Sequence, residues 1–356
     1  MQIICPTCNA QYNLPAEKIP EKRTWATCKK CGGSIEVEST APAQPVDMTA
    51  ISSDHHPRSV TSPESGEPAL LSLLADYPEL QGLDSERFDF VGIFSPNKKG
   101  GYKNRKNNLT LKILRAVQDV LAKQILKEAE KVLRIGKATA YYPAEIFFGN
   151  GFLTMMYNHY AIVCTDQRLI FVNINAKMNR PTHYFFQMPY EQIERVKRGL
   201  LGGSLTLYPF RGKRRTFMYV KALTANELKQ FIAGKSHSIK RAGRPEEAHE
   251  NLCPSCFVPL KKGLVSCPQC RARFKKPKKA FLKSLLLPGL GDIYLGHRAL
   301  GIFELIGSII VWLVALSLLV TMAEAGLIVA IFLLLFYNGL DGSLTYHMAN
   351  KGYMIA

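Results

Sequence analysis

The chain has 356 residues and a composition ordinary for a folded protein, with 47% hydrophobic and 21% charged residues. The 46 Lys and Arg against 28 Asp and Glu give a net charge of +18, and the length predicts two or three folding units. Nearly all of the strongly apolar sequence follows Phe281. These features exclude a wholly disordered chain, a collagen-like repeat and a multi-pass transporter.

Eight of the nine cysteines form four Cys-x-x-Cys pairs. The chain begins MQIICPTCNAQYNLP, without the basic and apolar stretches of a secretory signal, so we expect a reducing compartment where paired cysteines bind metal. Two pairs supply four thiolates in a tetrahedron, which makes a closed structural zinc site with no position for a catalytic water. Rubredoxin-like iron is the alternative metal. The predicted ligands of two zinc ions are Cys5, Cys8, Cys28 and Cys31, and Cys253, Cys256, Cys267 and Cys270.

The first predicted domain is a zinc ribbon over residues 1–38. Its characteristic residues are Ile3-Ile4-Cys5-Pro6-Thr7-Cys8, Tyr12, Leu14-Pro15, Lys18-Ile19-Pro20 and Cys28-Lys29-Lys30-Cys31-Gly32. With these residues it resembles the short finger-like zinc ribbons that open many bacterial proteins, a family that implies no enzymatic activity. Residues 39–68 contain five prolines among Ser, Thr and Ala, which predicts a disordered linker.

Residues 69–138 are predicted to be a helical segment that packs on the domain after it. Within it we expect a helix at about 110–134, because apolar residues recur every three or four positions and form one stripe. A helix that binds a partner or a membrane surface is the alternative. The stripe consists of Leu111, Leu114, Val117, Leu121, Ile125, Ala129 and Val132.

Residues 139–235 change to the period of β-strands. Strands at 159–165 and 168–174 predict a hairpin whose turn Asp166 caps through its side chain, and Cys164 is expected to be a buried apolar thiol. Further strands are predicted at 183–188, 192–198, 204–210 and 216–222. The pattern Thr224-Ala225-Asn226-Glu227 predicts the capping box of a closing helix. Short strands closed by one helix indicate a small barrel or sandwich.

Three stretches of this segment are distinctive: Thr165-Asp166, Arg168-Leu169-Ile170-Phe171-Val172 and Pro189-Tyr190-Glu191-Gln192-Ile193, followed by the closing helix. With them the segment resembles the bacterial pleckstrin-homology-like domains, which are generally binding or assembly modules. The resemblance implies a mainly-β domain with a C-terminal helix, and it assigns no ligand residues.

Residues 236–251 are predicted to be a second polar linker, and residues 252–274 a second zinc ribbon. The latter resembles a generic shorter ribbon with two Cys-Pro-x-Cys pairs. Residues 271–283 hold seven Lys or Arg and no acid. Because this tract precedes the apolar sequence, we expect it to contact anionic lipid.

Residues 275–350 are predicted to form an all-α membrane domain. The 21 residues from Ile302 to Met322 carry one charge, Glu304, and as a helix span roughly 31 Å, enough for a hydrocarbon core of ~30 Å. A second apolar run from Ala325 to about Thr345 completes an antiparallel hairpin. The basic tract before the hairpin places both termini in the cytosol by the positive-inside rule. The expected location is the bacterial inner membrane.

A short apolar run before the first spanning helix predicts a re-entrant or interfacial element. The sequence Pro288-Gly289, Gly291-Asp292, Tyr294 and Gly296 resembles the domain family with two transmembrane helices and a Gly/Tyr-rich motif, which implies a membrane location but no reaction. Asp341 fits the same pattern. One hypothesis pairs Arg298 or His297 with Glu304 or Asp341 to lock the hairpin. For Asp292, Glu304 and Asp341 the sequence indicates no role beyond packing.

The chain is thus predicted to be multidomain, with two small zinc ribbons, a mainly-β pleckstrin-homology-like domain and an all-α transmembrane hairpin. No catalytic motif or small-molecule substrate is evident, so we expect a non-enzymatic membrane-anchored adaptor or sensor that recruits a protein partner. One alternative is a membrane-tethered regulator that binds nucleic acid through the ribbons. Another is an accessory subunit of a transport or envelope-assembly complex.

Overall fold

A computed structural model describes residues 2–4, 11–13, 24–27, 34–37, 67–143, 145, 155–199, 203–238 and 249–356. The chain divides into two units, Met1–Thr61 and Ser62–Ala356, and each is described by itself. The predicted ligands Cys5, Cys8, Cys28 and Cys31 lie outside the described residues, as do most of both predicted linkers.

The first unit contains two antiparallel strand pairs. β1 (Gln2–Ile4) pairs with β2 (Gln11–Asn13), and β3 (Thr24–Thr27) pairs with β4 (Ser34–Val37). Each pair flanks one Cys-x-x-Cys sequence along the chain, and this order is typical of a zinc ribbon.

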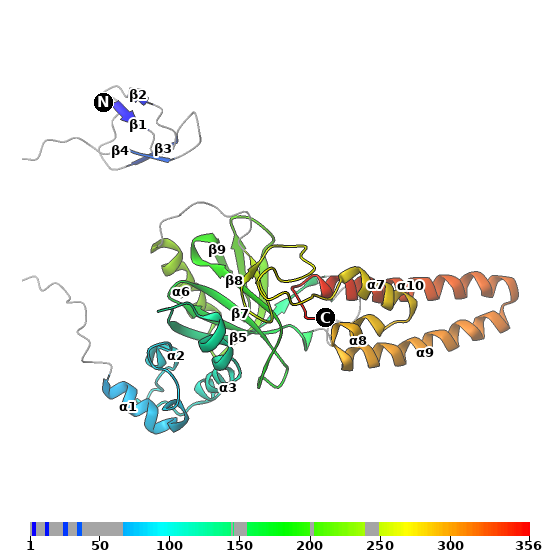
Figure 1. Ribbon diagram of the computed structural model, residues 1–356, viewed down its shortest axis with the longest axis horizontal. Helices are drawn as coiled ribbons and strands as arrows, with labels where there is room; N and C mark the ends of the chain where they lie inside the picture. The colour runs from blue at the N-terminus through cyan, green and yellow to red at the C-terminus, as the bar shows by residue number, and fades with distance from the viewer. Residues whose placement is uncertain are drawn as a thin grey trace, which may run out of the picture. The chain divides into compact units, whose positions relative to one another are not determined.

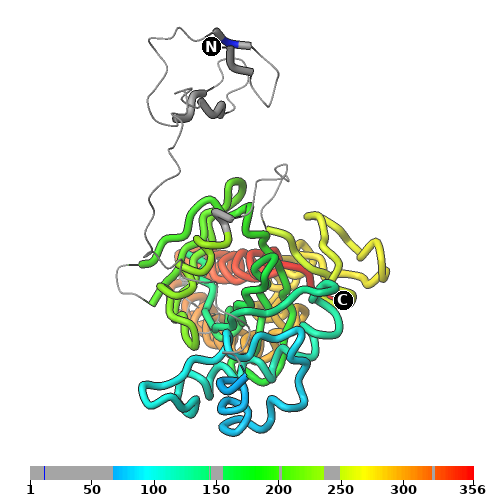
Figure 2. The backbone as a smooth tube through the Cα atoms, turned by 90° about the vertical axis from the view of Figure 1, so that its left-hand side faces the viewer, coloured from blue at the N-terminus to red at the C-terminus, as the bar shows by residue number. Residues whose placement is uncertain are grey.

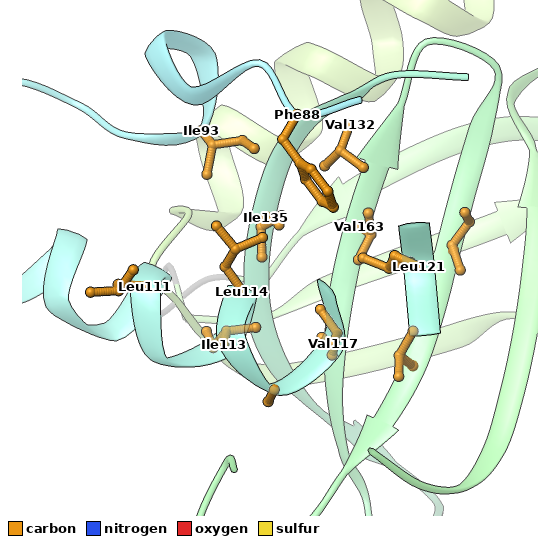
Figure 3. Packing of buried hydrophobic residues seen from close by; sticks show 14 of the residues in the cluster. Phe88, Ile93, Leu111, Ile113, Leu114, Val117, Leu121, Val132, Ile135 and Val163 are labelled. Atoms are coloured by element: carbon orange, nitrogen blue, oxygen red, sulfur yellow. The ribbon is translucent and has the colours of Figure 1, made fainter. Parts of the chain in front are cut away.

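The second unit begins with helices that cover one face of a sheet. They are α1 (Glu67–Asp76), the short 3-10 helix η3 (Pro78–Leu80), α2 (Phe90–Ile93) and α3 (Arg105–Val120). The Asn104 side chain caps α3 by accepting a hydrogen bond from the Asn107 N–H at 2.8 Å. Ile113 and Leu114 of α3 pack toward Ile135 and Val163 of the sheet (Figure 3).

The predicted helix at 110–134 is too long by several residues. A π-helical turn, η4 (Leu121–Ile125), follows α3, and Val132 already opens the strand β5 (Val132–Tyr141). Ala129 adopts a left-handed φ of 58°, which a continuing helix does not allow. Glu130 accepts from the Lys127 N–H and pairs with buried Arg168 at 2.7 Å, so this turn is pinned to the sheet. The predicted domain boundary at 138/139 lies within β5.

The sheet has nine antiparallel strands in the order β13-β12-β8-β7-β6-β5-β11-β10-β9. The predicted hairpin is confirmed at its bounds, and the four later predicted strands are found within two residues of theirs. After β5 come β6 (His159–Thr165), β7 (Arg168–Ile174), β8 (Pro181–Pro189), η5 (Tyr190–Gln192), β9 (Ile193–Arg198), β10 (Leu205–Pro209), β11 (Arg215–Lys221), β12 (Glu250–Leu252) and β13 (Pro259–Leu260).

The other face of the sheet encloses an aromatic core beneath α6 (Ala225–Ser238). The Phe171 ring stacks on Phe186 and Phe217, with centroids 4.4 and 5.1 Å away. The thiol of Cys164 is fully buried, as predicted, and burial raises its pKa.

The sequence predicted a capping box at the start of α6 and a cap by Asp166 at the β6–β7 turn, and only the first is found. The capping box of α6 is present, since the Glu227 N–H donates to Thr224 Oγ1 and the Thr224 N–H donates to Glu227 Oε2. The β6–β7 turn is capped by Thr165 Oγ1, which accepts from the Arg168 N–H at 3.0 Å. Asp166 instead accepts from the Lys131 N–H, because the segment before β5 lies beside this turn.

The chain ends in four helices: α7 (Pro277–Leu286), α8 (Leu290–Leu295), α9 (Arg298–Thr321) and α10 (Ala323–Ala349). Figure 1 shows α9 and α10 side by side as a long hairpin that extends beyond α7 and α8. In the turned view of Figure 2, residues 249–276, drawn in yellow, lie next to the C-terminus, where Phe274 forms a β-bridge with Ile355.

Candidate metal centre and helical hairpin

Four of the predicted ligands gather into one cluster. The Sγ atoms of Cys253, Cys256, Cys267 and Cys270 all lie within 4.8 Å of one another. The Cys253–Cys270 and Cys256–Cys267 sulfur pairs are 3.7 and 3.6 Å apart, and all four are free thiols. A tetrahedral zinc ion with bonds of about 2.3 Å requires sulfur atoms about 3.8 Å apart, so the spacing fits zinc. It is far too long for a disulfide.

The two Cys-x-x-Cys turns of this cluster repeat one backbone geometry. The N–H of the residue after each pair, Phe257 or Arg271, donates to the carbonyl of its first cysteine at 2.9 or 3.0 Å. Both residues have a left-handed φ, 56° and 59°. Residues other than glycine rarely adopt this backbone conformation, so its repetition shows that the two turns are built alike and present their thiols in the same way.

The cluster is joined to the large sheet through β12. Glu250 and Asn251 pair with Gln187 and Phe186 of β8, and β12 also pairs with β13. The Phe257 ring packs edge-on against Phe185 at 5.0 Å. The predicted linker 236–251 therefore begins in α6 and ends in β12, and the four-cysteine cluster directly follows a strand of the sheet.

The C-terminal segment connects the cluster to the end of the hairpin. The Lys275 N–H donates to the Met354 carbonyl and the Ala356 N–H to the Arg273 carbonyl, both at 2.9 Å. The Tyr353 ring lies 4.5 Å from that of Phe274, and its hydroxyl accepts from the Leu264 N–H. No sequence signal predicted these contacts.

The end of α10 is also buried against the sheet domain. Lys351 is 6% exposed, forms an ion pair with Glu145 and donates to Asn158 Oδ1 at 2.7 Å. Burial lowers the pKa of Lys351, and Glu145 opposes this shift. The Tyr184 hydroxyl of β8 donates to the Met348 carbonyl at 2.9 Å. These contacts place a buried, hydrogen-bonded charge between the end of the hairpin and the sheet domain, and removing either partner would leave the other charge buried and unpaired.

The two helices of the hairpin are long and apolar enough to cross a membrane. Only 17% of the most apolar window of α9 and 22% of that of α10 is buried, so most of each apolar helix is not covered by the rest of the chain. Their exposed surfaces carry large side chains such as Leu313, Val320, Ile328, Phe332 and Leu335, each more than 60% exposed. Lipid is the solvent that suits such a surface.

A sharp break separates α7 from α8 where the sequence predicted an interfacial or re-entrant element. Gly289 and Gly296 both adopt left-handed φ values, 86° and 98°, at the two ends of α8. The three lysine Nζ atoms of Lys275, Lys279 and Lys283 lie 5.6 to 5.8 Å from the centroid of the Tyr294 ring. On α7 itself, Leu282 and Leu286 are 61% and 76% exposed.

Three carboxyl groups meet at the base of the hairpin. Oxygen atoms of Asp292, Glu304 and Asp341 lie within 4.8 Å of one another, and all three residues are buried. Asp341 accepts from the Gly289 N–H at 3.0 Å, and Asp292 accepts from the Thr345 hydroxyl at 2.7 Å. These two bonds join α8 to α10.

The structure pairs His297 with Asp292, and not with Glu304 or Asp341 as the sequence suggested. His297 Nδ1 lies 3.1 Å from Asp292 Oδ1, across the turn at Gly296, so its carboxylate partner is neither of the two that were named. Arg298 is exposed. The sequence missed this pair because Asp292 and His297 are joined by a turn rather than by helical spacing.

Two family matches fall on this chain. Residues 1–36 match a zinc-ribbon domain, and residues 126–233 match the bacterial PH domain. No curated protein matches the chain. The two matches confirm the first predicted ribbon and the pleckstrin-homology-like (PH-like) domain. Together with the four-cysteine cluster and the apolar helices, they fit a membrane-associated, zinc-binding protein of several domains.

Proposed function

We propose that the protein is a non-enzymatic adaptor or sensor, anchored in the bacterial inner membrane by α9 and α10 with both termini in the cytosol. Two zinc ions fold the two ribbons, because units this small bury too little surface to hold together alone. The PH-like domain recruits a protein partner at the membrane surface.

The observation that supports this proposal most directly is the buried junction around Lys351. It joins the end of α10 to Glu145 and Asn158 of the PH-like domain. A module fixed in this way presents one surface at one height above the bilayer, and anchoring raises its local concentration for a membrane-bound partner.

The basic tract supports a contact with anionic lipid. Lys279 and Lys283 lie on α7 with Tyr294 beside them, and the exposed Leu282 and Leu286 lie on the same helix. Exposed leucines interleaved with lysines on one side of a helix suit a bilayer interface, where the apolar side chains enter the lipid and the longer lysines reach the headgroups.

The test uses the tagged full-length chain in its native membranes. We expect it to resist alkaline carbonate extraction, and we expect reporters fused to the C-terminus and inserted at Met322 to report opposite sides of the membrane. Crosslinking followed by mass spectrometry should recover a stoichiometric membrane or cytosolic protein. Release by carbonate contradicts the anchor, and recovery of RNA or DNA in place of a protein supports the nucleic-acid alternative.

A further inference from the structure

A pocket of about 470 Å³ lies between α3 and the face of the sheet that α3 covers. Three cationic side chains line it: Arg105 from the first turn of α3, Lys137 from β5 and Lys221 from the end of β11. Leu109 and Met178 form its apolar wall. Its volume lies within the range of pockets that hold small ligands.

Two of these cations are neighbours in the sheet. Lys137 and Lys221 are directly opposite each other in the register of β5 and β11, so their side chains lie on the same face. Like charges in this position repel and destabilise a sheet. Burial lowers the pKa of Lys137, and the charges of Lys221 and Lys112 lower it further.

A bulge with a strained backbone precedes Lys221 and determines the direction of its side chain. The register of β11 against β5 shifts between Met218 and Lys221. Tyr219 and Ala222, on either side of Lys221, have left-handed φ values of 52° and 67°. A bulge of this kind redirects the side chain that it carries. The left-handed backbone of two non-glycine residues costs free energy, and strain of this kind is often found at functional sites.

The cations that line the pocket take part in no ion pair with the residues that the structure describes. Among the described residues of the second unit, the ion pairs do not include Arg105, Lys137 or Lys221. The adjacent Lys106 forms an ion pair with Glu227 at 3.1 Å. A second hollow, of about 350 Å³, shares Met178 with the pocket and adds Lys112 to its lining.

The number of charges indicates the kind of ligand. One phosphate group carries about −1.5 to −2 at pH 7, so two phosphates match Arg105, Lys137, Lys221 and the nearby Lys112. Arginine binds phosphate through its planar fork, and lysine does so as a point charge. We propose that this pocket binds a small soluble molecule with two or more phosphate groups, whose less polar part lies against Leu109 and Met178. The proposal is independent of the zinc sites and of the membrane anchor.

The test is isothermal titration calorimetry of the full-length protein in phosphatidylcholine nanodiscs, with ATP and inorganic pyrophosphate as probes. We expect saturable binding of one molecule per chain that weakens as salt is added. Lys137→Gln and Lys221→Gln should each weaken it at least tenfold. Lys123→Gln is the matched control, because Lys123 is exposed and pairs with Asp119, away from the pocket lining.

A melting measurement separates loss of the site from loss of the fold. Removing one of two repelling charges should leave the melting temperature of ligand-free Lys221→Gln equal to or above that of the wild type. Wild-type protein that binds neither probe, or lysine variants that bind as tightly as the wild type, overturn the proposal. Displacement of both probes by phosphatidylglycerol in the nanodisc also overturns it, because the ligand would then be a lipid headgroup.

Discussion

Gly289 and Gly301 pack backbone against backbone where the break before α8 meets α9. A Cβ on Gly289 would overlap the Gly301 carbonyl oxygen, and a Cβ on Gly301 would lie 2.5 Å from the Gly289 carbonyl oxygen. The same break places the Gly289 N–H on Asp341 of α10. The close contact at the base of the hairpin therefore requires glycine at both positions 289 and 301.

Gly301→Ala should destabilise the membrane domain by about 1–3 kcal/mol, the usual cost of forcing a methyl group into a packed site. The loss is measured by the thermal unfolding midpoint in mild detergent. Gly339→Ala in α10 is the control, because nothing lies within 4 Å of a Cβ placed there. Equal midpoints for the two variants would show that the contact does not stabilise the hairpin.

Zinc content should fall when one cysteine of either set is removed. We expect about two ions per wild-type chain and about one in Cys267→Ser, because a four-coordinate structural site rarely retains its metal with three thiolates. Elemental analysis of protein purified without chelator measures this. Cys164→Ala, which removes the buried thiol of β6, should leave the zinc content unchanged. An unaltered zinc content in Cys267→Ser would argue against a metal at the described cluster.

Lys351→Met should destabilise the junction between the hairpin and the PH-like domain by about 3–5 kcal/mol, because Glu145 is left buried without its partner. Limited proteolysis in detergent should then cut the chain near the junction faster than in the wild type. The double variant Lys351→Met with Glu145→Met removes both charges and should recover most of the protection. If the single and double variants are cut at the same rate, the ion pair does not hold the junction.

Stability should fall as the pH is lowered from about 7 to about 4. Burial lowers the pKa of His183 to about 4, with His297 and Lys275 adding to the effect, and burial lowers that of His249 to about 3. Because an unfolded histidine has a pKa near 6.5, the unfolded chain binds protons in this interval that the folded chain does not. The folded state is therefore favoured above pH 6.5 and loses this advantage as the pH falls.

Urea midpoints measured at several pH values in zinc-containing buffer test this dependence. The double variant His183→Gln with His249→Gln should show a shallower decline than the wild type between pH 7 and pH 5. Protonation of the thiolate ligands also lowers stability in acid, but it does so equally in the wild type and the double variant, so the difference between their curves reports the two histidines. Parallel curves would assign the acid sensitivity to other groups.

The sequence predicted those parts of the fold that short-range patterns determine. The hairpin of β6 and β7 has its predicted bounds, since apolar strands and a turn at Asp166-Gln167 suffice to specify it. The capping box of α6 and the two apolar helices were predicted for the same reason. The predicted helix at 110–134 extended too far, because Val132 continues the helical spacing of apolar residues although it lies in β5.

Contacts between distant segments were not predictable from such patterns. β12 is three residues long and joins β8, which lies more than 60 residues earlier, so its pairing has no local signal. Lys351 is one lysine among many, and only its burial distinguishes it. The cost of charge in an apolar helix predicted that Glu304 and Asp341 need polar surroundings, but it did not show that Asp292 completes the cluster.

The four-cysteine cluster lies next to a strand at the edge of the sheet, which matters for chains that lack metal. β12 pairs with β8 at Gln187 and Phe186 and covers that part of its edge, and the cysteine turns directly follow β12. If the turns open, we expect β8 to become an unprotected edge strand, which is a template for pairing with another chain. Zinc starvation would then lead to self-association of this protein, so the metal would serve as a safeguard against aggregation.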